Sequence, residues 1–96
     1  MIRYQNYKLY EPNIVQDSRG NKTNEFIHIK DVRAMIFTAQ KNIFIDELGY
    51  QLVDVITMKT TLNYKDDISV GMKIGEFIIK SLINEGTMIS ATLEVI

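Results

Sequence analysis

Residues 88–96 read MISATLEVI, and they decide the fold class because apolar and polar side chains alternate along them. The apolar residues that share one face of an extended chain are Ile89, Ala91, Leu93 and Val95. Successive side chains of a strand point to opposite faces, whereas a helix would scatter these residues around its circumference. The stretch therefore predicts a β-strand with one buried face.

Two further strands precede this one in the last third of the chain. Residues 77–83 are apolar and rich in β-branched side chains, which favour strands. The turn at 84–87 contains a glycine, and Gly75-Glu76 fits a two-residue hairpin loop. We expect a three-stranded antiparallel meander over 72–74, 77–83 and 88–95.

The first half of the chain predicts two strands around a turn. Residues 8–15 form a short strand in which Pro12 marks a sheet edge, and Asp17-Ser18-Arg19-Gly20-Asn21 is the turn. The following segment, 25–40, carries apolar residues on both parities: Ile27 and Ile29 on one, and Val32, Ala34 and Ile36 on the other. A β-bulge near Lys30-Asp31 would bring all five to the core; two short strands with a break are the alternative.

The segment 50–62 alternates as well, with Tyr50 and Leu52 on the parity of Met58. The overlapping segment 43–56 also approximates helical spacing. We favour a strand from about Leu52 onward, because Gly49 and the β-branched residues that follow disfavour a long helix.

These elements predict an all-β fold: a small antiparallel barrel or sandwich of about five to six strands with one long loop over 38–49. Ninety-six residues hold enough apolar mass for one core, so we expect a single domain over 1–96.

Composition narrows the function classes. With 11 basic and 12 acidic side chains the net charge is −1, which argues against wrapping nucleic acid. The absence of cysteine excludes disulfides, thiolate nucleophiles and Cys-based zinc sites. Without a signal-peptide pattern or a run of roughly 18 apolar residues, the protein is expected in a reducing cytosol.

Few residues are suited to catalysis or metal binding. His28 is the single histidine and lies on the parity opposite Ile27 and Ile29. Asp66-Asp67 lacks the ligand spacing of an EF-hand loop and is better explained as a solvated turn. For Asp46-Glu47, nothing in the sequence indicates a pocket that would drive the two pKa values apart for acid–base catalysis. The glycines of 71–75 fit hairpin geometry better than a phosphate loop. We predict no catalytic, cofactor-binding or metal-binding residue, and hence no enzyme.

Two segments are candidates for interaction surfaces. Tyr4, Tyr7 and Tyr10 recur every three residues and are interpreted as docking onto a protein partner, with base stacking or plain packing as alternatives. The long loop has polar ends around an apolar centre, which a barrel flank, a neighbouring subunit or a channel would cover. Its candidate interface residues are Thr38, Gln40, Lys41, Asn42, Ile43, Phe44, Ile45, Asp46 and Glu47.

From about residue 7 to the end, the order of elements resembles the head–tail joining (head closure, or stopper) proteins of long-tailed bacteriophages. The matching segments are the turn Asp17–Gly20, the core strand Val32-Arg33-Ala34, the pair Met58-Lys59, the hairpin Lys73–Ile79 and the closing strand Ile89–Val95. Arg33 stands where that family often has Trp, and Phe77 where Tyr is usual.

The resemblance implies a connector subunit that forms a twelvefold homo-oligomeric ring between the portal–adaptor complex and the tail. The ring would surround the DNA path without sequence-specific binding, with the loop 38–49 facing the channel, and it would be assembled in the host cytoplasm into the virion neck. No cofactor and no membrane is implied. The alternative function is an oligonucleotide-binding barrel for single-stranded nucleic acid, and a small-molecule enzyme is the least favoured.

Overall fold

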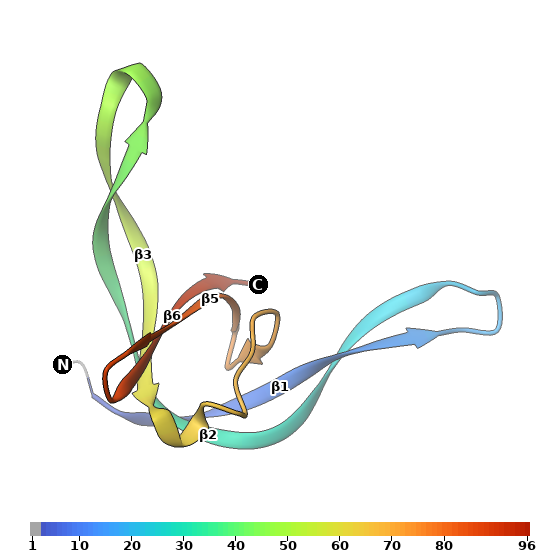
Figure 1. The fold of residues 1–96 in the computed structure, drawn as a ribbon. Coiled ribbons are helices and arrows are strands. Elements are labelled where there is room, and N and C mark those ends of the chain that lie inside the picture. Colours follow the sequence, from blue (N-terminus) through green and yellow to red (C-terminus); the bar gives the residue numbers. More distant parts are fainter. Residues whose placement is uncertain (1–2) are drawn as a thin grey trace.

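The computed structural model describes residues 3–96, apart from the side chains of Asn24, Ile43 and Leu48. Within this range the chain forms six antiparallel strands and two single-turn 3-10 helices: β1 Gln5–Gln16, β2 Lys22–Ile45, η1 Asp46–Leu48, β3 Gly49–Thr61, η2 Leu62–Tyr64, β4 Lys73–Ile74, β5 Phe77–Glu85 and β6 Met88–Val95. The strands close into a barrel in the order β1-β2-β3-β6-β5-β4 (Figure 1). The predicted all-β barrel is therefore confirmed, as is the meander formed by β4, β5 and β6.

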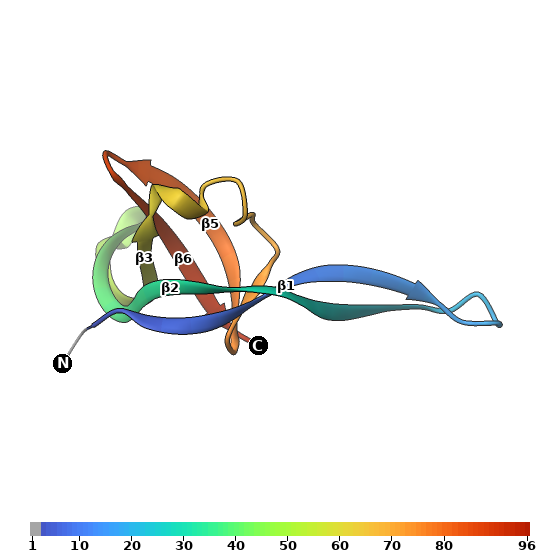
Figure 2. The same ribbon diagram turned by 90° about the horizontal axis from the view of Figure 1, so that it is seen from below.

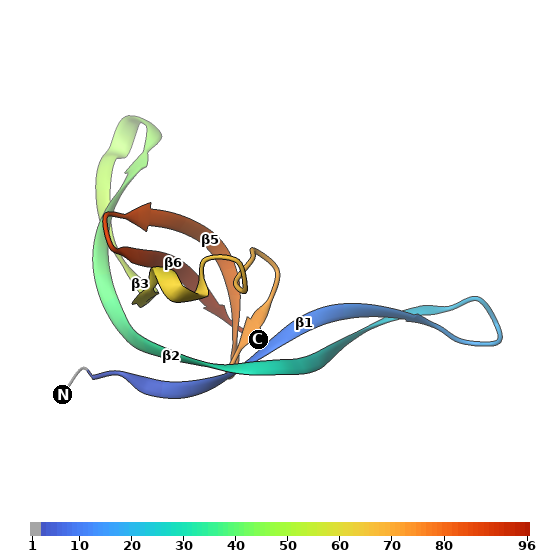
Figure 3. The same ribbon diagram turned by 60° about the horizontal axis from the view of Figure 1, so that its bottom comes forward.

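The barrel interior is filled by one set of inward-facing side chains from all six strands. These buried residues are Leu9, Val32, Ala34, Met58, Ile74, Ile79, Ala91 and Leu93. They are joined by Ile68, from the segment between η2 and β4, which lies inside the ring of strands in the view of Figure 3. On β6 the predicted alternation holds for Ile89, Ala91 and Leu93. Val95 is 61% exposed, because β6 has no partner in β3 beyond Leu93.

Closure of the barrel depends on the short strand β4. It pairs with β1 only through Leu9↔Ile74 and Tyr10↔Lys73. The turn after β4 adds a backbone hydrogen bond of 2.9 Å from the Gly75 N–H to the Lys8 carbonyl. Gly75 has a φ of +58°, which disfavours any other residue, and the Tyr7 ring lies against it. Glycine therefore lets this turn close tightly over β1.

The strand β2 changes its pairing partner in the middle of the barrel. Its first half pairs with β1 as far as Ala34, and its second half pairs with β3 from Ala34 onward. Each half runs past the barrel with its partner, which gives two projecting hairpins. We name them arm 1 (residues 11–27) and arm 2 (residues 39–55), and Figures 1 and 2 show them leaving the barrel in different directions.

The two arms make the molecule extended for its length. Its radius of gyration is 15.9 Å, against about 12.5 Å for a compact domain of this size. Its accessible surface is 6942 Å², against roughly 5,700 Å² for a folded monomer of the same mass. The molecule thus exposes roughly 1,200 Å² more surface than a compact fold needs.

The predicted long loop over 38–49 is wrong, because this segment is part of arm 2. β2 continues through Thr38 to Ile45, and the 3-10 turn η1 at Asp46–Leu48 leads directly into β3. The rival helix over 43–56 does not form either, apart from that single turn. Eight of the twelve residues of the predicted loop, 38–45, pair residue by residue with Gly49–Ile56.

The predicted bulge is present, but its consequence differs from the expectation. Leu9 pairs with Lys30 and Tyr10 pairs with His28, so Ile29 is the extra residue, one position before the predicted site. The expectation that Ile27 and Ile29 share the core with Val32 is wrong: they are 44% and 40% exposed. They lie at and beyond the root of arm 1, where no second layer covers the sheet.

Truncation of the core residue Leu93 tests where the stability of the fold resides. Leu93→Ala should lower the free energy of unfolding by about 2–5 kcal/mol, because it leaves a cavity in the barrel interior. Val95→Ala, on the same strand and parity but exposed, should change it by only about 0.5 kcal/mol or less. Urea denaturation followed by circular dichroism measures both, and equal losses would contradict the assigned core.

Candidate assembly surfaces

One face of arm 2 continues the interior face of the barrel into solvent. No register shift interrupts the β2–β3 ladder, so residues of one parity stay on one side along its whole length. Within the barrel this side carries Ala34, Ile36 and Met58, which belong to the core or pack against it. Beyond the barrel the same side carries Phe44, Tyr50 and Leu52.

These three side chains form a bare apolar patch, which we call the arm 2 patch. Phe44, Tyr50 and Leu52 are 64%, 73% and 60% exposed. Phe44 and Tyr50 are paired across the ladder, and their rings meet edge to face with centroids 5.4 Å apart. This contact holds the aromatic end of the patch together without burying it.

Arm 2 also leaves its backbone edges unpaired. Among residues 3–96, residues 35–45 of β2 pair only with β3, and residues 49–55 of β3 pair only with β2. Neither run contains proline. Rows of free N–H and C=O groups are a template for pairing with another chain. Arm 2 can therefore accept both an apolar partner and an added strand.

Arm 1 carries a different surface near its root. Tyr10, Pro12 and Phe26 lie on one side of the hairpin, with Pro12 paired opposite Phe26. The Lys73 ammonium reaches over them from β4, 4.7 Å from the Tyr10 ring centre and 5.7 Å from that of Phe26. Pro12 has no N–H to donate along the outer edge of β1, so this edge is less suited to strand addition than arm 2.

The tip of arm 1 is ordered by Asp17. One of its carboxylate oxygens accepts hydrogen bonds from the backbone N–H groups of Arg19 at 2.8 Å and Asn21 at 2.9 Å. These bonds, that from Asn21 first, hold the pKa of Asp17 below its ordinary value. The charged form is thus the one that the folded tip prefers.

Acidification should loosen this tip before it affects the barrel. Because the folded-state pKa of Asp17 is depressed, its contribution is complete above pH 3.8 and is lost as the pH falls through the folded value. Hydrogen exchange of the Arg19 and Asn21 amides should therefore accelerate, beyond its intrinsic pH dependence, at low pH. Asp17→Asn, which keeps one acceptor oxygen without the titration, should remove this extra step; an unchanged profile in that variant would contradict the assignment.

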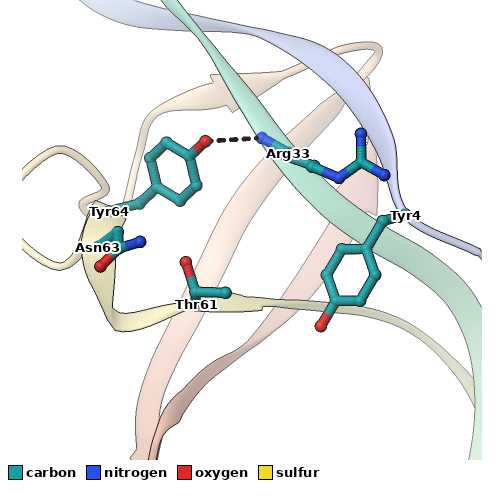
Figure 4. Close-up of a pocket in the computed structure, with 5 residues that line it drawn as sticks. All are labelled: Tyr4, Arg33, Thr61, Asn63 and Tyr64. Carbon is teal, nitrogen blue, oxygen red and sulfur yellow. Dashed lines mark hydrogen bonds between the residues drawn. The ribbon is translucent and has the colours of Figure 1, made fainter.

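A hollow of about 330 Å³ lies at the other end of the β2–β3 ladder from the tip of arm 2. It is lined by Tyr4, Arg33, Thr61, Asn63 and Tyr64, and we call it the foot pocket (Figure 4). Residues from three separate parts of the chain meet here: the start of the chain, the middle of β2, and the end of β3 with η2. Two tyrosine rings and three hydrogen-bonding side chains thus face one small space.

The backbone of Arg33 is held by two side chains from β3 and η2. Its N–H donates to the Tyr64 hydroxyl at 3.3 Å, and its carbonyl accepts from the buried Thr60 hydroxyl at 2.7 Å. The β2–β3 ladder begins only at Ala34, so these two side chains satisfy polar groups that the ladder leaves open. The guanidinium therefore projects from a fixed point.

Charge at the foot pocket is unbalanced. Lys30, near the Tyr64 ring, is already paired with Asp67 at 2.9 Å. No carboxylate of residues 3–96 pairs with the Arg33 guanidinium. The pocket lining thus contains one uncompensated cation, and the Thr61 hydroxyl and the Asn63 amide lie across the pocket from it (Figure 4).

The structure distributes the predicted docking residues over several surfaces. Tyr4 lines the foot pocket, Tyr7 packs against the core, and Tyr10 lies at the root of arm 1. The three tyrosines therefore do not form one stacking platform. The predicted interface segment lies along arm 2, with Asp46 and Glu47 at its tip; the side chain of Ile43 lies outside the described part.

Other polar residues of the sequence form surface pairs. His28 lies 2.9 Å from Asp31 on the exposed side of β2, and Asp67 pairs with Lys30. In the described range 3–96, no three His, Asp or Glu side chains gather as metal ligands would. That same range holds no helix with the length and hydropathy needed to cross a membrane.

Comparison with known proteins gives one likeness of fold. No family model matches the chain, and no curated protein matches its sequence. A chain in the structure of the virion of a native gene transfer agent particle matches with a TM-score of 0.57. The match covers 100% of this chain and 96% of that chain, at 14% sequence identity. At this identity the likeness concerns the fold, and it extends over the arms as well as the barrel.

Proposed function

We propose that this chain is a structural protein of a phage-like virion that works by assembling with other virion proteins and has no catalytic role. The observation that carries this proposal is the arm 2 patch, three large apolar side chains exposed on a projecting hairpin. A two-stranded hairpin is only marginally stable alone in water. Its length and its bare face are explained if neighbouring molecules cover it in an assembly.

The size of the exposed surface agrees with this role. The roughly 1,200 Å² by which the molecule exceeds a compact monomer is comparable to the surface buried in a specific protein–protein interface. This excess comes from the arms, since the barrel itself is closed. The arms therefore supply the area that a stable contact requires.

The fold likeness supports a virion role, because the matching structure is a gene transfer agent particle. The sequence resemblance to head–tail joining proteins narrows the proposal to a connector subunit in the virion neck. In that role copies of the chain form a ring, twelvefold as in the resembling family, between the portal–adaptor complex and the tail. The residues 38–47 on arm 2 then face a neighbouring subunit or the DNA channel, and assembly takes place in the host cytoplasm.

The near-neutral charge suits such a ring. A net charge of −1 gives the chain no general surplus of phosphate-binding side chains. A strongly basic lining would hold DNA by phosphate contacts, whereas a conduit has to let it slide. DNA would therefore pass the ring without sequence-specific binding.

Removal of the arm 2 patch should abolish assembly and leave the barrel folded. Phe44→Ser with Leu52→Ser deletes exposed apolar groups, so the free energy of unfolding should change by only about 0.5 kcal/mol per site. Capture on portal–adaptor complexes encoded in the same genome should fall at least about tenfold, because buried aromatic and aliphatic anchors dominate interfaces. Co-purification after co-expression measures the capture, and thermal melting measures the stability.

The matched control is Val70→Ser with Ile83→Ser, two apolar residues off the arms that are 60% and 57% exposed. This control should fold and assemble like the unmodified chain. Undiminished capture of the arm 2 variant, or equal losses in both variants, would contradict the proposed role. A large loss of stability in the arm 2 variant would show that these residues belong to the core.

A further inference from the structure

The tip of arm 2 and the foot pocket lie at opposite ends of one strand. β3 leaves the tip at Gly49 and reaches the pocket at Thr61, twelve residues later. At about 3.3 Å per residue the two sites are roughly 40 Å apart. They cannot meet within one molecule, but the tip of one copy can reach the pocket of another.

The tip presents an acidic group on a tightly built turn. Glu47 is exposed in η1, between Asp46, which adopts the strained φ of +31°, and the turn-ending Gly49 at +84°. Glycine accepts such angles freely, whereas Asp46 is held in one that most side chains avoid. The turn therefore places the exposed Glu47 at the far end of the two-stranded arm 2.

The foot pocket offers what a carboxylate needs. Arg33 supplies an uncompensated guanidinium, and Asn63 and Thr61 supply further hydrogen-bond donors from the pocket wall. Tyr4 and Tyr64 flank the space in Figure 4. Its volume of about 330 Å³ equals roughly ten water molecules, enough for a carboxylate side chain.

We propose that the foot pocket of one copy of this chain binds the Glu47 carboxylate at the arm 2 tip of a second copy. The contact is head-to-tail, because it joins two different surfaces of the same molecule. Repeated contacts of this kind generate a ring when the rotation closes. This inference deepens the proposed assembly role and rests on it, and it adds the pair of side chains that joins neighbouring subunits.

A nucleic-acid phosphate is a weaker candidate for the same pocket. Binding to a phosphate backbone depends on several cations acting together. The pocket lining contains one cation, and the nearby Lys30 is neutralised by Asp67. A single carboxylate matches this charge more closely.

The test uses two variants of the full chain, each of which keeps one half of the contact. ¹⁵N-labelled Glu47→Gln protein retains the pocket, and unlabelled Arg33→Gln protein retains the acidic tip. Adding the unlabelled protein at low ionic strength should shift the Asn63 and Tyr64 amide resonances of the labelled protein in a saturable way. The two variants can form only one contact per pair, so the result does not depend on ring closure. Circular dichroism spectra like that of the unmodified chain confirm that both variants fold.

The control ligand is the unlabelled double variant Arg33→Gln with Glu47→Gln, which should bind at least about tenfold more weakly. Equal binding of the two ligands, or no shift up to about 1 mM, would overturn the inference. So would a thymidine oligonucleotide that shifts the pocket resonances when the tip donor does not. If the pocket resonances do not shift but the arm 2 variant still loses capture on portal–adaptor complexes, this contact is wrong and the proposed assembly role stands.

Discussion

The rest of the structure depends on the change of partner that β2 makes at Ala34. Ala34 is paired with Gln5 on one edge and Thr60 on the other, and its side chain is fully buried. Fully extended, the 24 residues of β2 would span about 80 Å, but the longest dimension of the molecule is 51 Å. The strand therefore bends around the barrel. The bulge at Ile29 shifts the register of its pairing with β1 by one residue. A central barrel and two arms follow from this one bent strand.

Apolar side chains are buried in the barrel and exposed on the arms, because only in the barrel do other strands lie opposite them. Leu9, Met58 and Ile79 are removed from water because the ring closes over them. Phe44 and Tyr50 obey the same parity rule as Met58 but have nothing opposite them. Folding free energy thus comes from the barrel, whereas the apolar area of the arms stays available for association.

Sequence alternation predicted which side each residue faces, but it could not predict how far the barrel extends. The strand Met88–Val95 and the meander can be predicted because the apolar residues of their strands recur regularly. The segment 38–49, which forms the first half and the tip of arm 2, reads as a loop, because its polar residues weaken the alternation and ladder pairing leaves no local signal. The foot pocket cannot be predicted from the sequence. Arg33 and Tyr64 are 31 residues apart, and only the end of the β2–β3 ladder brings them together. No pattern within either segment marks that meeting.

Because each arm is a hairpin beyond the barrel, its reach is set independently of the packed interior. One extra residue on each side of the tip at 46–48 would lengthen arm 2 by about 3.3 Å and leave every existing pair in register. The same insertion inside the ring would turn core side chains outward. Related chains can therefore differ in arm length, and hence in the spacing of the molecules that they bridge, while they share one unaltered barrel.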